Sequence, residues 1–311
     1  MELIEGVELS KLCDYSFGDQ SGQWSNVFTS FMKEANSDNL EFVEKLNQIK
    51  KSRNYMTLFI DNIRLYKRDI KNTKPEDMEY VQSLMEKNDL LNLCSYFKDM
   101  NFIIFTNLED TPIDVHIENV IPENVICISA VNALFWNQKV IPSPYGIQRK
   151  MYPNDNKCDI LKQVMVESIF PKNLLYVNHN ENTNLKERQG INELFNNQSW
   201  SLVDKERVEY YQFLRTIKHF KFVLCPIGNA IDCHRNWEVL YLGRVPVMKK
   251  HPYLQELYKN YPVLFVDDYN HITEELLKEN DFLYKKIKNL DISDLTLPKF
   301  YDSIIKQYKK D

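Results

Sequence analysis

The sequence lacks the features that would assign it to a membrane or to a nucleic-acid partner. No apolar run reaches the roughly 20 residues that a helix needs to cross a bilayer. The net charge is −5, which gives no reason to expect binding to nucleic acid. The amino terminus is acidic and lacks the basic and apolar segments of a signal peptide. We therefore expect a soluble, cytoplasmic protein.

The sequence also gives no sign of a metal site or a disulfide framework. Its six cysteines form no C-x-x-C pair and show no zinc-finger spacing with histidine. In a chain of this length such thiols are typical of a reducing compartment. No D-x-D motif follows a predicted strand in a suitable context, and the pair Asp267 and Asp268 is not that motif. We predict no metal and no bound cofactor.

Composition and pattern predict an α/β protein of two domains. Hydrophobic residues make up 43% of the 311 residues, which supports a core and argues against disorder. Short apolar runs alternate with helical stretches, as in parallel βαβ units. The best linker is 142–146, with two prolines and a glycine. The expected strands are 13–17, 56–60, 102–105, 125–129, 139–141, 174–177, 200–203, 222–224, 245–248 and 263–266, and the expected helices are 27–35, 40–50, 75–99, 206–220, 273–287 and 298–309.

The stretch 221–248 has the pattern strand, turn, helix, strand. Asp232 is the expected N-cap of the helix, and Gly243 stands where a glycine often ends one. Arg235 and Glu238 are three residues apart and therefore share a face.

This arrangement suits a sugar nucleotide. A helix amino terminus that follows a parallel strand offers free N–H groups to a phosphate, and His234 and Arg235 would add donors there. Glu238, one turn later, could accept both hydroxyls of a ribose. A surface Arg–Glu pair on an ordinary helix is the alternative interpretation.

The same stretch resembles the donor-binding motif of GT-B glycosyltransferases of the exostosin-like family and, more distantly, that of the α-1,3-fucosyltransferases. The residues that fit the exostosin-like pattern are Pro226, Gly228, Asp232, Arg235, Glu238, Leu240, Gly243, Pro246 and Val247. Val239 stands where the family has alanine. The resemblance implies two Rossmann-like domains that face an interdomain cleft. Residues 1–145 would bind the acceptor and 146–290 the nucleotide sugar, and a helix in 291–311 would cross back to the first domain.

Flanking segments extend the resemblance. The Asn-rich turn of 178–184 precedes Arg188, as in both families, where the arginine contacts the donor diphosphate. An ordinary Asn-rich turn is the alternative. Residues 129–147 resemble the interdomain crossover of the exostosin-like family. The donor-site residues implied in this sequence are Asn178, Asn180, Arg188, Gly228, Asn229, His234, Arg235 and Glu238.

The segment 104–112 resembles the strand-end loop that holds a catalytic carboxylate. Asp110 has a proline two residues on, as in the exostosin-like pattern, whereas Glu109 is nearer to the fucosyltransferase pattern. A carboxylate at the carboxyl end of a strand suits general-base catalysis. Asp19 and Asp61, after the first and second expected strands, are rival bases. A plain turn is the alternative for the Asp110 loop, and a glycine-flanked turn with a helix-capping serine is the alternative for the Asp19 loop.

The resemblance implies an inverting, metal-independent glycosyltransferase that moves a sugar from a nucleotide-diphosphate sugar to a hydroxyl of a glycan acceptor. UDP is favoured over GDP. Two alternatives stay open, a nucleotide-sugar epimerase of the same fold and a glycan-binding relative without catalysis. The exostosin-like relatives of the Golgi carry a membrane anchor, so its absence favours a bacterial or viral source.

Overall fold

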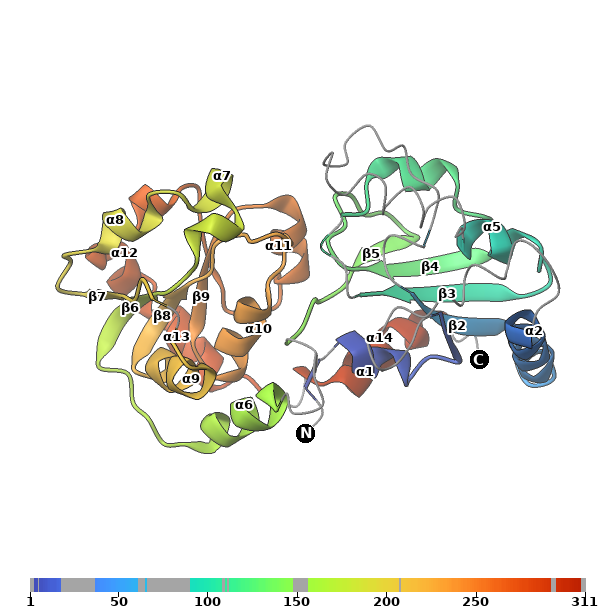
Figure 1. The fold of residues 1–311 in the computed structure, drawn as a ribbon, viewed down its shortest axis with the longest axis horizontal. Helices are drawn as coiled ribbons and strands as arrows, with labels where there is room; N and C mark the ends of the chain where they lie inside the picture. Colours follow the sequence, from blue (N-terminus) through green and yellow to red (C-terminus); the bar gives the residue numbers. More distant parts are fainter. Residues whose placement is uncertain are drawn as a thin grey trace. The chain divides into compact units, whose positions relative to one another are not determined.

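The computed structural model describes residues 3–4, 6–17, 37–60, 65, 90–107, 110, 112–147, 156–206, 208–291 and 295–308. The chain divides into two compact units (Figure 1). The amino-terminal unit comprises Glu2–Tyr145 together with Leu297–Asp311, and the carboxy-terminal unit comprises Gly146–Thr296. Each unit contains one parallel sheet with helices between most successive strands, so the predicted α/β class is confirmed. Within the described ranges, no helix combines the length and the apolar character needed to cross a membrane.

The sheet of the amino-terminal unit has five parallel strands in the order of the chain. Every described residue of β2 is buried, as is most of β3 and β4, which fits parallel strands covered on both faces. The predicted strand over 13–17 is shorter, because only two of its residues pair with β2. The strands are β1 (Tyr15–Ser16), β2 (Tyr55–Ile60), β3 (Asn101–Thr106), β4 (Val125–Ala130) and β5 (Val140–Pro142).

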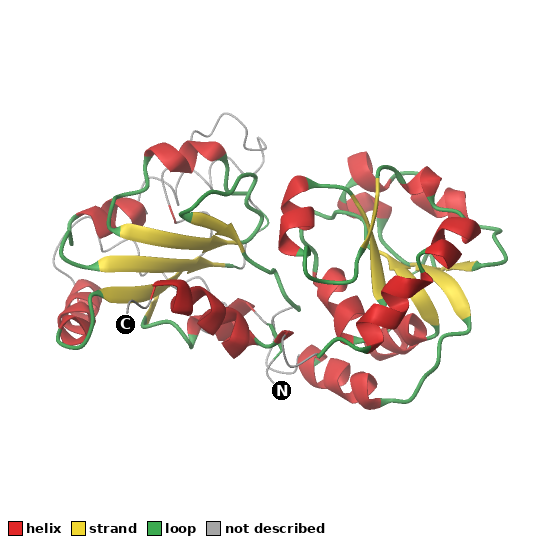
Figure 2. Ribbon diagram, turned by 180° about the vertical axis from the view of Figure 1, so that it is seen from behind, coloured by secondary structure: helices red, strands yellow, loops and turns green. Residues whose placement is uncertain are grey.

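The last helix of the chain, α14 (Leu297–Tyr308), packs on this sheet. The ring of Tyr301 stacks on Phe105 at a centroid distance of 5.1 Å, and its hydroxyl lies 3.1 Å from Oγ1 of Thr57. Figures 1 and 2 show α14 along one face of the strands, beside α1 (Gly6–Ser10). The other helices described in this unit are α2 (Ser37–Lys50), α5 (Leu90–Ser95) and the 3₁₀ helix η3 (Val115–Asn119).

The sheet of the carboxy-terminal unit also has five parallel strands, in the order β10-β9-β8-β6-β7. The chain goes from β6 outward to β7, then crosses to the other side of β6 and continues through β8, β9 and β10. The order therefore reverses between β6 and β8, and loops at such a point diverge and leave a crevice for a ligand. The strands are β6 (Asn173–Val177), β7 (Ser201–Val203), β8 (Phe220–Leu224), β9 (Val245–Lys249) and β10 (Leu264–Val266).

The helices of this unit differ from the prediction at their ends. The helix expected over 206–220 begins at Tyr210, because the side chain of Glu209 caps it by accepting a hydrogen bond from the backbone N–H of Gln212. The helix expected over 273–287 is broken at Asn280. The helices are α6 (Lys157–Val166), α7 (Leu185–Arg188), α8 (Ile191–Phe195), α9 (Tyr210–Lys218), α10 (His234–Tyr241), α11 (Pro252–Leu257), α12 (Glu274–Glu279) and α13 (Asp281–Lys288), with the 3₁₀ helices η4 (Glu181–Thr183) and η5 (Tyr269–His271).

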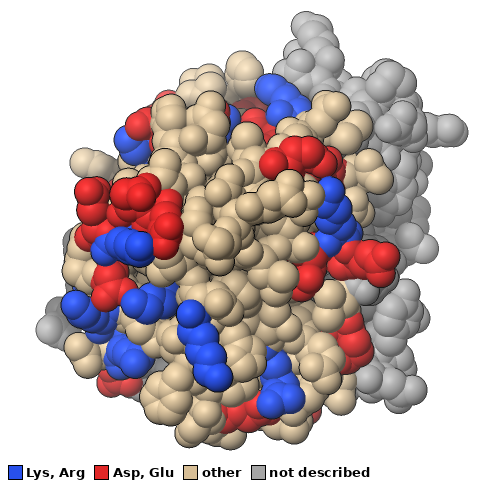
Figure 3. All heavy atoms as spheres, turned by 90° about the vertical axis from the view of Figure 1, so that its left-hand side faces the viewer, with Lys and Arg blue, Asp and Glu red and all other residues tan. Residues whose placement is uncertain are grey.

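Two expected helices are not fully covered by the described residues. The stretch 27–35 lies outside them, and of 75–99 only α5 and the residues that follow it are described. The surface in Figure 3 shows the side of the carboxy-terminal unit near α8 and α12, where acidic and basic side chains are interspersed around an uncharged area. This face therefore shows no continuous basic surface of the kind that binds nucleic acid.

Candidate functional site

The carboxy-terminal unit contains a cavity of about 510 Å³ beside the loop that follows β8. Four predicted donor-site residues line it, namely Arg188, His234, Arg235 and Glu238. Side chains of α6 and α9 line it as well, namely Lys157, Tyr210 and Phe213. The cavity therefore collects residues from segments that are far apart in the chain.

The helix α10 carries three of these residues, and its start differs from the prediction. It begins at His234 with Cys233 as N-cap, and no side chain caps it. The prediction that Asp232 is the N-cap is therefore wrong. Its fully buried carboxylate instead accepts hydrogen bonds from Nδ2 of Asn236, Nε1 of Trp237 and the hydroxyl of Tyr258, at 2.9, 2.7 and 2.6 Å. Because both oxygens of this carboxylate accept from core side chains, they do not cap the helix. The predicted glycine at the end of the helix is confirmed, because Gly243 has a φ of 67°.

Arg188 joins the loops that follow β6 and β8. Its guanidinium donates from Nε to the carbonyl of Ile227, from Nη1 to that of Asn180 and from Nη2 to that of Pro226, at 2.8, 3.1 and 2.9 Å. The side chain is buried, and burial lowers the pKa of Arg188. No described carboxylate forms an ion pair with it. Three of its five N–H groups are thus used, and a buried positive charge faces the cavity without a counter-ion.

Arg235 adds a second cation to the same wall. Its guanidinium lies over the ring of Phe213, 5.2 Å from the centroid. Its Nε is buried without a hydrogen-bond partner, and the described residues offer the group no ion pair. The side chain as a whole is only partly buried and lines the cavity, so an anion that enters the cavity can reach the guanidinium. The position favours an anionic ligand between Arg188 and Arg235.

Two carboxylates line the cavity, and Glu238 is the buried one, whereas Glu209 is exposed and caps α9. The side chain of Glu238 is 5% exposed, and the hydroxyl of Tyr210 donates to its Oε1 at 2.9 Å. Burial raises the pKa of Glu238 above the ordinary 4.5, and the hydrogen bond from Tyr210 and the charges of Arg235 and Lys157 offset part of that rise. Glu238 thus provides a hydrogen-bond acceptor in the part of the lining that it shares with Tyr210.

Two histidines lie near these charges. His234 is placed with Nδ1 2.8 Å from the carbonyl oxygen of Gly146, so Nδ1 carries a proton and donates. His179, after β6, is buried, and neither of its ring nitrogens has a hydrogen-bond partner. Burial and the neighbouring charges of Arg235 and Arg188 lower the pKa of His179 to about 4. It is therefore neutral at pH 7 and adds no third charge.

The remaining predicted donor-site residues do not line the cavity, although Gly228 packs against Arg188, which does. The amide of Asn178 donates to the carbonyls of Asp204 and Glu206, and the side chain of Asn180 caps η4. Asn229 is exposed. Gly228 lies so close to Arg188 that an added Cβ would be 2.9 Å from Nη2. The contacts of Asn178, Asn180 and Gly228 give these three residues a supporting position.

The candidate bases belong to the amino-terminal unit. Asp110 is exposed and accepts a hydrogen bond of 3.0 Å from the hydroxyl of Tyr145. The buried Asn107 donates to the carbonyl of Pro144 at 3.2 Å, so the loop after β3 is tied to the expected linker. Glu109, Asp19 and Asp61 lie outside the described residues.

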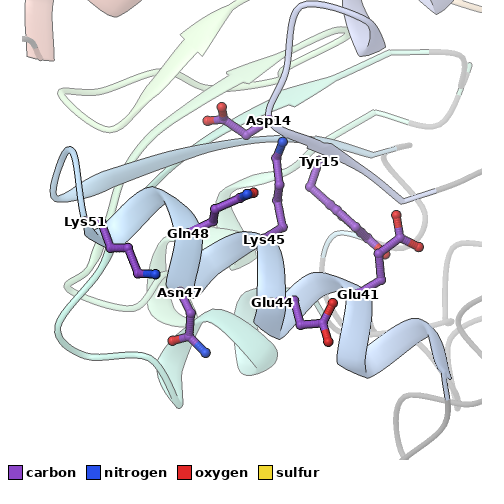
Figure 4. A pocket seen from close by; sticks show the side chains of 8 residues that line it. All are labelled: Asp14, Tyr15, Glu41, Glu44, Lys45, Asn47, Gln48 and Lys51. Atoms are coloured by element: carbon purple, nitrogen blue, oxygen red, sulfur yellow. The ribbon is translucent and has the colours of Figure 1, made fainter.

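A second cavity, of about 460 Å³, lies between α2 and β1 (Figure 4). The charged side chains around it include both acids and lysines, such as Glu41, Glu44 and Lys45. Asp14, at its rim, accepts hydrogen bonds from the backbone and the hydroxyl of Thr57 and pairs with Arg53. That carboxylate therefore holds the start of β1 in place. In the part of the chain that the structure describes, no group of three or more His, Cys, Asp or Glu side chains could hold a metal ion.

Sequence reasoning missed the wall that α6 and α9 contribute. Lys157, Tyr210 and Phe213 carry no motif, and Tyr210 reaches Glu238 across 28 positions. The one available signal was the helical spacing of Tyr210, Phe213 and Leu214, which marks a face of α9 that packs against its neighbours.

No protein-family model and no curated protein sequence matches the chain. Among solved structures, the chain is similar to a crystal structure of an α1,3-fucosyltransferase, with 10% sequence identity, a TM-score of 0.39, and coverage of 84% of this chain and 91% of that chain.

Proposed function

We propose that this chain is a glycosyltransferase and that the cavity of the carboxy-terminal unit binds its nucleotide-diphosphate sugar. The observation that carries the proposal is the pair Arg188 and Arg235, two cations on one wall for which the described residues provide no ion pair. A diphosphate supplies the missing negative charge and the acceptors for their remaining N–H groups.

A comparison with Arg244 supports this reading of Arg188. Arg244 is equally buried, but its guanidinium makes five hydrogen bonds to the backbone carbonyls of Lys218, Leu242, Gly243 and Ile169. It is a structural arginine that the fold satisfies completely. Arg188 makes three such bonds and lines a cavity. The difference indicates that Arg188 keeps donors for a ligand.

Glu238 and the sheet topology support the nucleotide part of the proposal. Glu238 lines the same cavity as the arginines, and a carboxylate suits the two hydroxyls of a ribose rather than a phosphate. The sheet order reverses between β6 and β8, and Arg188 bonds to the loops that follow these two strands. Crevices at such reversals are the usual ligand sites of open parallel sheets.

The proposed reaction is a single displacement with inversion. A carboxylate of the amino-terminal unit, first Asp110 and then Glu109 or Asp19, takes the proton of an acceptor hydroxyl. The hydroxyl oxygen forms a bond to the anomeric carbon while the bond from that carbon to the diphosphate breaks. Arg188 and Arg235 stabilise the charge that develops on the leaving diphosphate, a task for which no metal is then required. We favour UDP over GDP and a glycan as acceptor because of the sequence resemblance.

A thermal-shift screen with UDP, GDP and their sugars, in EDTA and then in Mg²⁺, tests the proposal. A ligand of the folded state raises the melting temperature, and we expect this rise without added metal. Arg235→Ala should remove it. The control is Arg215→Ala, because Arg215 pairs with Glu167 outside the cavity. No shift with any nucleotide, or an equal loss in both variants, would contradict the proposed site, and donor turnover without an acceptor would indicate an epimerase.

A further inference from the structure

Two buried carboxylates of the carboxy-terminal unit differ sharply in how they are satisfied. Asp232 receives three side-chain donors. Glu238 is 5% exposed and receives one, from Tyr210. Oε2 of Glu238 receives no hydrogen bond from the described residues. A carboxylate offers about four acceptor positions, so Glu238 retains capacity that the protein leaves unused, at a place where it lines the cavity.

Tyr210 is held firmly enough to orient that carboxylate. It is the first residue of α9, and its ring stacks on Phe213 at a centroid distance of 6.4 Å and an interplanar angle of 29°. Nζ of Lys157 lies 5.7 Å from the centre of the same ring. Phe213 in turn carries the guanidinium of Arg235. One continuous stack therefore connects the cation proposed for the diphosphate with the hydroxyl that binds Glu238.

We propose that Tyr210 is a positioning residue that makes the cavity selective for ribonucleotides over 2′-deoxyribonucleotides. By donating to Oε1, the hydroxyl fixes the plane of the Glu238 carboxylate and leaves Oε2 to accept from the adjacent 2′ and 3′ hydroxyls of a ribose. Without this bond the carboxylate can rotate about its last side-chain torsion, which is broad and weakly restricted. The inference rests on the proposed function, because it assigns the ribose of the donor to Glu238.

The selectivity has a physical basis in the burial of Glu238. A buried ionised carboxylate that lacks its donors is costly. A ribonucleotide supplies two hydroxyls to it, whereas a 2′-deoxyribonucleotide supplies one and leaves the second acceptor position unpaired. Binding sites built to accept a hydroxyl reject the analogue that lacks it for this reason.

The test is to measure, by calorimetry, the affinity for UDP and 2′-deoxy-UDP, and for GDP and 2′-deoxy-GDP, with the wild-type chain and with Tyr210→Phe. We expect the wild-type chain to prefer the ribose form of its nucleotide by about tenfold or more, since hydrogen bonds to charged groups are the stronger ones. Tyr210→Phe should lose most of that preference and keep its affinity for the deoxy form within about twofold, because the ring and its stack remain.

The matched control is Tyr211→Phe. Tyr211 is the next residue of the same helix, and its hydroxyl donates to Glu167 at 3.0 Å, away from the cavity lining. This variant should keep the wild-type preference. If Tyr210→Phe weakens both sugar forms equally, or changes neither, the positioning role is wrong although the nucleotide site stands. If the wild-type chain binds no nucleotide at all, the proposed function itself fails, and this inference fails with it.

Discussion

Gly228 and Arg188 are packed so closely that no side chain fits between them: a Cβ at position 228 would lie 2.9 Å from Nη2 of Arg188 and 3.1 Å from Sγ of Cys233. The guanidinium cannot easily give way, because three backbone carbonyls hold it. The amide of Asn184 fixes the other partner by donating to the carbonyl of Gly228 at 2.8 Å. The glycine thus sets the position of an arginine that faces the cavity.

Gly228→Ala should therefore weaken nucleotide binding as well as the fold. We expect a loss of about 1–3 kcal/mol in the free energy of unfolding, as for overpacked sites, and a clear loss of nucleotide affinity. Gly190→Ala is the control, because its φ of 78° strains the backbone while nothing lies within 4 Å of the added carbon. It should lower stability and keep the affinity. Urea unfolding and calorimetry distinguish the two, and equal affinity in both variants would refute this account.

The sequence predicted the main elements well because the strands are short apolar runs that end at turns. The positions of β6, β8, β9 and β10 follow the predicted runs closely. Sequence patterns also named four residues that line one cavity, since they lie on two segments that follow strands and whose pattern is local. The features that could not be predicted are those that depend on contacts made in the folded core. Asp232 has the residue type of a cap, but Trp237 and Tyr258 draw it into the core.

The partner of Glu238 could not be predicted for the same reason. The contact with Tyr210 joins α9, which precedes β8 in the chain, to α10, which follows it, and it depends on how these two helices pack. The break of the predicted helix at Asn280 is another case, because its helical pattern continues through the break and only the backbone shows two helices. Local pattern determines the elements, and packing determines which side chains meet.

Glu238→Gln should stabilise the fold and weaken nucleotide binding. Because the pKa of Glu238 is raised in the folded state, the folded chain binds more protons than the unfolded chain between the two pKa values. The contribution of Glu238 to the free energy of unfolding therefore falls as the pH rises from about 4.5 through the pKa that Glu238 has in the folded chain. Above that window the ionised carboxylate is a cost that glutamine removes, while the amide can still accept from Tyr210.

The measurement is thermal unfolding of both forms across pH. The melting temperature of Glu238→Gln should exceed that of the wild-type chain at neutral pH, and the gap should narrow as the pH falls. Nucleotide affinity at neutral pH should drop about 10- to 100-fold, because hydrogen bonds to a charged acceptor are lost. A variant that is less stable at neutral pH would show that the ionised carboxylate supports the fold.

Arg244→Met should lower the stability of the fold and leave nucleotide binding unchanged, which is the opposite of the effect expected for Glu238→Gln. Arg244 donates five hydrogen bonds to carbonyls at the ends of α9 and α10 and before β6. Removal of the guanidinium leaves these buried acceptors unpaired, which should cost about 3 kcal/mol or more in the free energy of unfolding. Urea unfolding measures the loss. Calorimetry at a temperature where the variant is folded should give the wild-type nucleotide affinity, and a large change there would place Arg244 in the binding machinery.

Asp110→Asn tests the base without disturbing its surroundings. The amide oxygen of asparagine can still accept the hydrogen bond from Tyr145, so the loop after β3 should keep its form, but the group can no longer take a proton. If Asp110 is the base, the rate of transfer should fall about 10²- to 10⁴-fold, while nucleotide affinity in the other unit stays as it was. Asp114→Asn is the control, because Asp114 caps η3 by accepting from the backbone N–H of His116 and should matter only to stability. Full transfer activity in Asp110→Asn would move the base to Glu109 or Asp19, and the same substitution at each would then decide between them.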